Sequence, residues 1–80
     1  MKYIVVEKGG LEIPVIFSTL FGHDEIASNF PNNKVVGAGF CTIDVATGKY
    51  NCYGVSVSLR IKSRMEIDNA VLNHEGHNRH

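Results

Sequence analysis

Hydrophobic and polar positions alternate in two stretches, and each stretch predicts a β-hairpin. In the first, residues 2–8 and 11–17 flank Gly9-Gly10, a strong signal for a two-residue turn. Pro14 lacks an N–H, which places the second strand at a sheet edge or beside a bulge. With Lys8 paired to Leu11, one face of this hairpin collects Ile4, Val6, Leu11, Ile13, Val15 and Phe17.

The second hairpin is longer and spans residues 34–61. A four-residue loop joins its strands, with Asp44 bonding the loop backbone and Gly48 supplying a positive φ. If Asp44 pairs with Lys49, alternate positions form an apolar face that we expect to belong to the core. That face holds Val36, Ala38, Phe40, Tyr53, Val55, Val57, Leu59 and Ile61.

The opposite face of the long hairpin is nearly bare. It consists of Gly37, Gly39, Cys41, Cys52, Gly54, Ser56 and Ser58. Glycines weaken a strand interior, so one interpretation is a surface on which another chain or element lies close. The alternative is a strongly coiled sheet that needs glycine to bend and leaves this face in water. Cys41 lies across from Cys52, where a bridge is geometrically possible, although we favour two reduced, packed thiols.

Two short helices complete the pattern. The first is expected within residues 22–30, with Asp24 and Glu25 in its first turn. The second is expected over residues 64–73, because Ser63 and Glu66 match a capping box and Gly76 is a plausible stop. The predicted fold is α+β, in the order ββαββα, with a four-stranded, mainly antiparallel sheet and both helices on one face. We expect residues 1–74 to form one domain and residues 75–80 to form a flexible polar tail.

The C-terminal helix has two apolar stripes at the α-helical period. One contains Ile67, Ala70 and Val71, and the other contains Met65 and Leu72. Arg64 and Asp68 lie between the stripes, where they can pair at i and i+4. Either one stripe is left for a partner, or the helix is sunk deeply enough to bury both.

Length and charge limit the classes of function. Eighty residues make one small domain with a marginal core, so completion by a partner or a second copy is a reasonable expectation. Eight basic and eight acidic side chains balance to a net charge of zero. A neutral chain argues against bulk nucleic acid or anionic membrane as the main partner. The sequence also contains no secretory segment and no stretch of transmembrane length, which predicts a cytoplasmic protein.

Candidate chemistry is sparse. The histidines at positions 74, 77 and 80 could bind a metal, but Gly76 interrupts their helix, so we predict no metal site. Cys41 or Cys52 with His23 could in principle form a nucleophile and a base, yet no local signature supports the pair. We therefore expect no catalytic residues, no cofactor and no enzymatic activity.

Arg60, Lys62 and Arg64 form a small basic run. Arg60 and Lys62 share one side of a strand end and are candidate phosphate contacts. This run supports the alternative of a nucleic-acid or nucleotide-binding module, although few aromatic side chains are placed to stack bases.

Several short stretches resemble small uncharacterised proteins of tailed phages and prophages. They are Val36-Gly37-Ala38-Gly39-Phe40-Cys41, Cys52-Tyr53-Gly54-Val55-Ser56-Val57-Ser58-Leu59 and Ser63-Arg64. The resemblance carries no catalytic or binding residues across, and it implies a small protein made inside a bacterial host. We therefore expect a non-catalytic binding protein that contacts a host or phage protein such as a defence complex, with a homodimer also open. Its candidate contact residues are Gly37, Gly39, Gly54, Ser56, Ser58, Arg64, Met65, Asp68 and Leu72.

Overall fold

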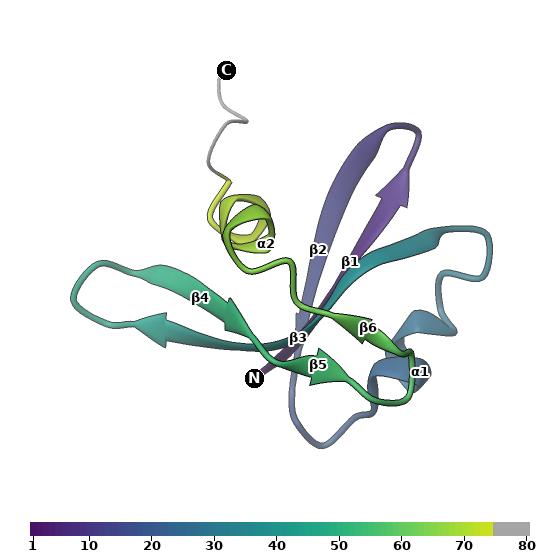
Figure 1. Cartoon of the computed structure of the whole chain (residues 1–80), viewed down its shortest axis with the longest axis horizontal. Helices are drawn as coiled ribbons and strands as arrows, with labels where there is room; N and C mark the ends of the chain where they lie inside the picture. Colours follow the sequence, from purple (N-terminus) through teal and green to yellow (C-terminus); the bar gives the residue numbers. More distant parts are fainter. Residues whose placement is uncertain (75–80) are drawn as a thin grey trace.

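The computed structural model describes residues 1–74 of the chain and confirms an α+β fold with a four-stranded antiparallel sheet and two helices (Figure 1). The sheet has the order β2-β1-β3-β4, and a separate pair, β5-β6, follows it in the chain. The elements are β1 (Lys2–Lys8), β2 (Leu11–Phe17), α1 (His23–Ala27), β3 (Lys34–Asp44), β4 (Lys49–Tyr53), β5 (Val55–Ser56), β6 (Ile61–Lys62) and α2 (Glu66–Leu72).

The first hairpin has the predicted register. Lys8 pairs with Leu11, and Gly9 and Gly10 both have positive φ in the turn between them. Pairs alternate between hydrogen-bonded and non-hydrogen-bonded positions away from a two-residue turn, which puts Pro14, opposite Val5, at a non-hydrogen-bonded position. The missing N–H of Pro14 therefore costs no bond to β1, and it removes a donor from the outer edge of β2.

The long hairpin is confirmed only near its loop. Asp44 pairs with Lys49, and the register continues as predicted as far as Phe40 opposite Tyr53. Beyond that point the prediction of a continuous hairpin to residue 61 is wrong. Gly54 has a φ of 80° and turns the chain away from β3, and β5 then pairs with β6 instead.

The sheet is covered on both faces. Side chains from alternate positions of β1 enter different clusters, and the four consecutive residues 3–6 are all buried. One cluster joins Tyr3, Val5, Cys41 and Cys52 to Val71 and Leu72 of α2. The other joins Ile4, Val6 and Ala38 to Ile26 and Ala27 of α1, with Phe30, Leu59 and Ile61 also packed against it.

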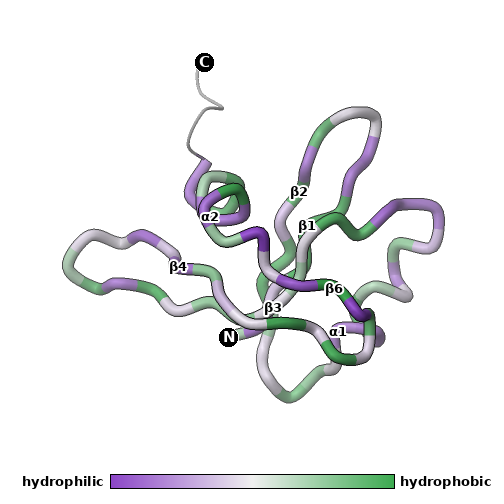
Figure 2. The backbone as a smooth tube through the Cα atoms, viewed as in Figure 1, coloured by the Kyte–Doolittle hydropathy of each residue, from purple (hydrophilic) through white to green (hydrophobic). Residues whose placement is uncertain are grey.

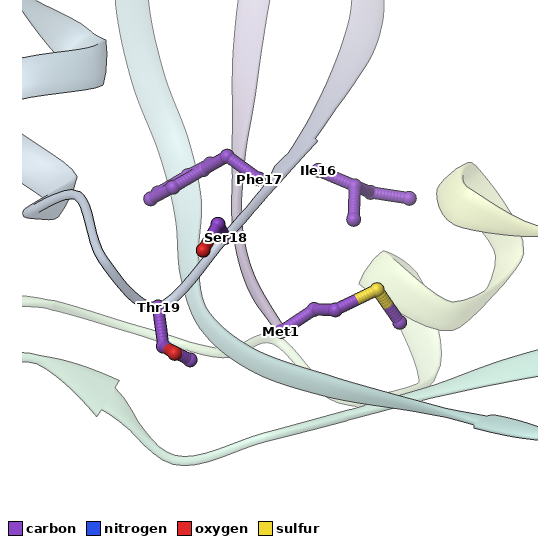
Figure 3. A pocket seen from close by; sticks show the side chains of 5 residues that line it. All are labelled: Met1, Ile16, Phe17, Ser18 and Thr19. Carbon is purple, nitrogen blue, oxygen red and sulfur yellow. The ribbon is translucent and has the colours of Figure 1, made fainter.

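The two helices consequently lie on opposite faces of the sheet, and the expectation that both share one face is wrong. The physical reason is the apolar run in β1, the inner strand between β2 and β3, because a strand that is hydrophobic on both sides needs cover on both. In Figure 3, the side chains of Ile16 and Met1 point toward α2, whereas Phe17 points to the other side.

Both helices are shorter than predicted. α1 covers five residues, and the backbone N–H of Gly22 donates to Glu25 Oε1 at 2.7 Å at its start. α2 begins at Glu66, two residues later than the capping box predicts, because Met65 has a φ of 48°. The hydroxyl of Ser63 instead accepts a hydrogen bond from the Met65 N–H, and it shares a 2.7 Å hydrogen bond with the Tyr3 hydroxyl, whose single proton goes to Asp68. The predicted stop at Gly76 and the predicted polar tail at 75–80 lie outside the described residues.

Candidate interaction surface

A buried polar network anchors α2 to the sheet. The Asp68 carboxylate is fully buried and accepts hydrogen bonds from the Tyr3 hydroxyl at 2.5 Å, the Arg64 backbone N–H at 3.0 Å and Arg64 Nε at 2.7 Å. The Arg64 guanidinium also reaches across to β2, where its two terminal nitrogens bond both carboxylate oxygens of Glu12 at 3.1 and 2.7 Å. The predicted Arg64–Asp68 pair is present; the Asp68 side chain is fully buried, so it cannot serve as a contact residue, whereas the Arg64 side chain remains 24% exposed.

The network explains one of the glycines on the bare face. A Cβ built on Gly37 would lie 2.6 Å from Asp68 Oδ1. At Gly39, a Cβ would lie 2.5 Å from the backbone oxygen of Tyr53. Both glycines are therefore positions at which another part of the same chain comes close. This agrees with the interpretation that glycine allows a close approach, and not with a face left in water.

The bare face is for the most part not a surface. Gly37, Gly39, Cys41, Cys52 and Ser56 are all buried by the chain itself, so the proposal that this face binds a partner is wrong for them. Val71 and Leu72 of α2 pack against the two cysteines, Asp68 of α2 lies over Gly37, and the backbone at Tyr53 lies against Gly39. Only Gly54 and Ser58 of the predicted set remain exposed.

The outer edge of β4 is closed by two asparagines of α2. The backbone N–H of Tyr50 donates to Asn73 Oδ1 at 2.7 Å, and the N–H of Cys52 donates to Asn69 Oδ1 at 2.6 Å. Asn73 Nδ2 in turn donates to the Tyr50 carbonyl at 3.0 Å. Two side chains one helical turn apart thus take the place of a neighbouring strand. They satisfy the outward backbone hydrogen-bonding groups of β4, which could otherwise pair with another chain.

The apolar stripes of α2 are used differently from either prediction. Val71 and Leu72, from different stripes, both face the sheet, so Leu72 cannot serve as a contact residue. Met65 and Ile67 are left exposed, at 58% and 56%. The helix is rotated in this way because the buried face must also place Asp68 over Gly37.

The basic run is divided by the fold. Arg64 is held by Glu12 and Asp68, and these hydrogen bonds raise the pKa of its guanidinium above the usual value. Arg60 is exposed in the turn before β6, and Lys62 is exposed as the last residue of β6. The candidate phosphate-binding surface is thus reduced to two side chains.

The residues considered for nucleophilic chemistry lie on different faces. His23 is buried between Phe17 and Phe40, whose rings meet it edge-on, and its Nε2 donates to the Gly39 carbonyl at 2.7 Å. Cys41 and Cys52 belong to the cluster beneath α2, on the other side of the sheet. Burial raises the pKa of both thiols, and that of Cys52 rises to about 12.

Side chains that the pattern assigned to the core are exposed from the end of β4, through β5, to the residue after it. Tyr53, Val55 and Val57, here called the valine strip, are 47%, 48% and 83% exposed. In Figure 2, the hydrophobic green of the two valines alternates with the pale colour of near-neutral residues along this segment. The sequence did not predict the valine strip as a surface, because its alternation is typical of a buried strand. Gly54 was the one residue in the sequence that signals where the strand leaves the sheet.

A hollow of about 360 Å³ lies beside the valine strip. Phe40, Val55 and Val57 line it together with Lys2, His23 and Asp24, and Ser58 is also at its wall. The Phe40 and Tyr53 rings stack at 5.9 Å, which joins the hollow to the strip. The hollow combines an apolar wall with one basic and one acidic side chain.

A second hollow, of about 460 Å³, lies at the end of β2 (Figure 3). It is lined by Met1, Ile16, Phe17, Ser18 and Thr19. The hydroxyls of Ser18 and Thr19 are the only polar side-chain groups at its wall, and the N-terminal amino group of Met1 already donates to the Cys41 carbonyl at 3.2 Å.

No protein-family model, curated protein or solved structure matches this chain. None of the helices within residues 1–74 is both long and apolar enough to span a membrane. In the same part of the chain, no three side chains of His, Cys, Asp or Glu are grouped so that they could hold a metal ion. Of the three histidines considered for a metal site, only His74 falls within it.

Proposed function

We propose that this chain is a non-catalytic, phage-type protein that acts by binding another protein through the valine strip and the hollow beside it. The observation that carries the proposal is the exposure of Tyr53, Val55 and Val57 in a segment whose pattern is that of a buried strand. Contiguous exposed apolar side chains are typical of interaction sites. The resemblance to phage proteins supports a host or phage protein in the bacterial cytoplasm as the partner.

The chemistry of the hollow favours a particular kind of contact. An apolar side chain of the partner would pack against Phe40 and Val55, while polar groups beside it would meet Lys2 and Asp24 at the wall. A buried apolar anchor with a charged surround is the usual composition of an interface centre and rim.

Strand addition is a less favourable mode of binding. The outward N–H groups of Tyr50 and Cys52 on β4 are already bonded by α2, and Pro14 removes a donor from the edge of β2. A partner that added a strand would need these donors. The proposed contact therefore uses side chains of the valine strip and not a sheet edge.

The experiment uses two valines that are matched in exposure. Val57→Asp alters the valine strip, whereas Val45→Asp alters the tip of the β3–β4 hairpin, where Val45 is 93% exposed. Tagged wild-type chain and both variants are passed through lysate of a bacterial host, and retained proteins are quantified by mass spectrometry. We expect one partner to be retained by the wild type and by Val45→Asp but lost with Val57→Asp.

Other results would redirect the proposal. Sedimentation of the purified chain distinguishes a second copy as the occupant, since a homodimer through the valine strip would dissociate with Val57→Asp and persist with Val45→Asp. Retention of the same proteins by all three forms would show that the valine strip is not the binding site. Retention of nucleic acid that falls steeply with salt and with Arg60→Ala would favour the nucleic-acid alternative.

A further inference from the structure

The two cysteines occupy a special position in the β3–β4 ladder. Cys41 pairs directly with Cys52, and the N–H of Cys52 points away from β3 to Asn69. In an antiparallel ladder, residues whose N–H groups point outward form the non-hydrogen-bonded pairs, in which the Cα atoms lie about 4.5 Å apart. Disulfides join Cα atoms about 4.4–6.8 Å apart, so this pair is within the range that a disulfide bridges.

We propose that Cys41 and Cys52 are a dithiol site that a small peroxide oxidises to a cross-strand disulfide. The site is independent of the valine strip, because the cysteines face α2 on the other side of the sheet. Both cysteines are free and buried in the structure, which is the reduced form of the pair.

The reaction balances with hydrogen peroxide as the oxidant. The Cys41 thiolate attacks one peroxide oxygen, the O–O bond breaks, and a sulfenic acid and hydroxide are formed. The Cys52 thiolate then attacks the Cys41 sulfur, the S–O bond breaks, and a second hydroxide leaves. The hydroxides take up the two thiol protons to give two water molecules, so the two sulfurs lose the two electrons that the peroxide gains.

Cys41 is the better first nucleophile of the two. Burial raises its pKa, but the positive N-terminal amino group opposes this rise, and that amino group donates to the Cys41 carbonyl at 3.2 Å. Burial raises the pKa of Cys52 to about 12, with the Tyr3 hydrogen bond opposing this rise and the Asp68 charge adding to it. Because α2 covers both thiols, oxidation requires transient opening of α2, and the folded chain should react more slowly than an exposed thiol.

The test compares oxidation of the folded and the unfolded chain. Reduced wild-type protein is treated with hydrogen peroxide in buffer and in guanidinium chloride, and free thiols and intact mass are followed with time. We expect the folded chain to lose both thiols together, with a mass loss of two hydrogens and no covalent dimer. Cys41→Ser and Cys52→Ser each remove the partner thiol and should abolish this product.

Stability of the oxidised form gives a second readout. A cross-strand disulfide that fits the folded ladder raises the melting temperature, and we expect an increase of about 5 °C or more. The proposal is overturned if the folded chain keeps two free thiols while the unfolded chain is oxidised. It is also overturned if the only product is an intermolecular dimer, or if the intramolecular disulfide lowers the melting temperature.

Discussion

The carboxylate of Asp68 lies over Gly37, so closely that a methyl group on Gly37 would be 2.6 Å from Asp68 Oδ1. The carboxylate cannot move aside cheaply, because Tyr3 and Arg64 hold it from both sides. A glycine on the sheet and an acid on the helix are thus required together. The distance between α2 and β3 depends on both.

Gly37→Ala is therefore expected to destabilise the fold by about 1–3 kcal/mol, the usual cost of overpacking a close contact. Urea denaturation measures the change. Gly22→Ala is the matched control, since its methyl group would also meet a carboxylate at 2.6 Å, but that carboxylate belongs to the exposed side chain of Asp24 and can rotate away. We expect a loss of about 0.5 kcal/mol there. Equal losses for the two variants would show that the Asp68 contact is not restrictive.

Asp68→Asn is expected to lower the free energy of unfolding by about 3 kcal/mol, because it leaves the Arg64 charge without its buried partner. Combining it with Arg64→Met in a double-mutant cycle should recover part of that loss. Glu12→Gln tests the other end of the guanidinium, where the side chain is 30% exposed and the expected loss is below about 1 kcal/mol. If the losses in free energy of unfolding for the two single variants simply add in the double variant, the Arg64 and Asp68 side chains are not energetically coupled.

Stability should fall in alkaline solution. Burial, the Asp68 hydrogen bond and the Asp68 charge raise the pKa of the Tyr3 hydroxyl well above its usual value, and the pKa of Cys52 rises to about 12. In the unfolded chain these groups lose their protons near pH 10 and about 8.5, respectively. Above about pH 9 the unfolded state therefore binds fewer protons than the folded state, and the free energy of unfolding decreases as pH rises.

We expect this decrease to reach roughly 3 kcal/mol between about pH 7 and 10.5 for the reduced protein. Urea denaturation at several pH values, with a reductant present, measures it. Tyr3→Phe combined with Cys52→Ala removes two of the three groups with a raised pKa, leaving the buried Cys41 thiol, and should reduce the dependence. An unchanged slope in that variant would assign the alkaline loss to other groups.

The asparagines of α2 should protect β4 from pairing with other chains. Asn69→Ala with Asn73→Ala removes three hydrogen bonds to β4 and exposes two unpaired N–H groups. We expect a loss of about 2–3 kcal/mol and concentration-dependent association seen by light scattering. Asn51→Ala, on the same strand and exposed, is the control and should change neither property. A monomeric double variant would show that Pro14 and strand twist suffice to prevent association.

Local residue chemistry determined the parts of the fold that lie close together in sequence. Gly9-Gly10 and the loop after Asp44 set the two hairpin registers, because turn residues with positive φ leave one way to pair the flanking strands. The Arg64–Asp68 pair also followed from helical spacing alone. In each case the interacting groups are a few residues apart, so the pattern contains both partners.

The tertiary structure alone decided which surfaces face water. Alternation along residues 53–57 is the same whether the segment joins β3 or leaves it, and the choice was made by Gly54 and by β6 as the partner of β5. Gly37 and the two cysteines of the bare face were likewise covered by α2, whose polar anchor on Tyr3 comes from the other end of the chain. Burial depends on contacts between distant segments, and hydrophobic periodicity records only that a face can be buried, not what buries it.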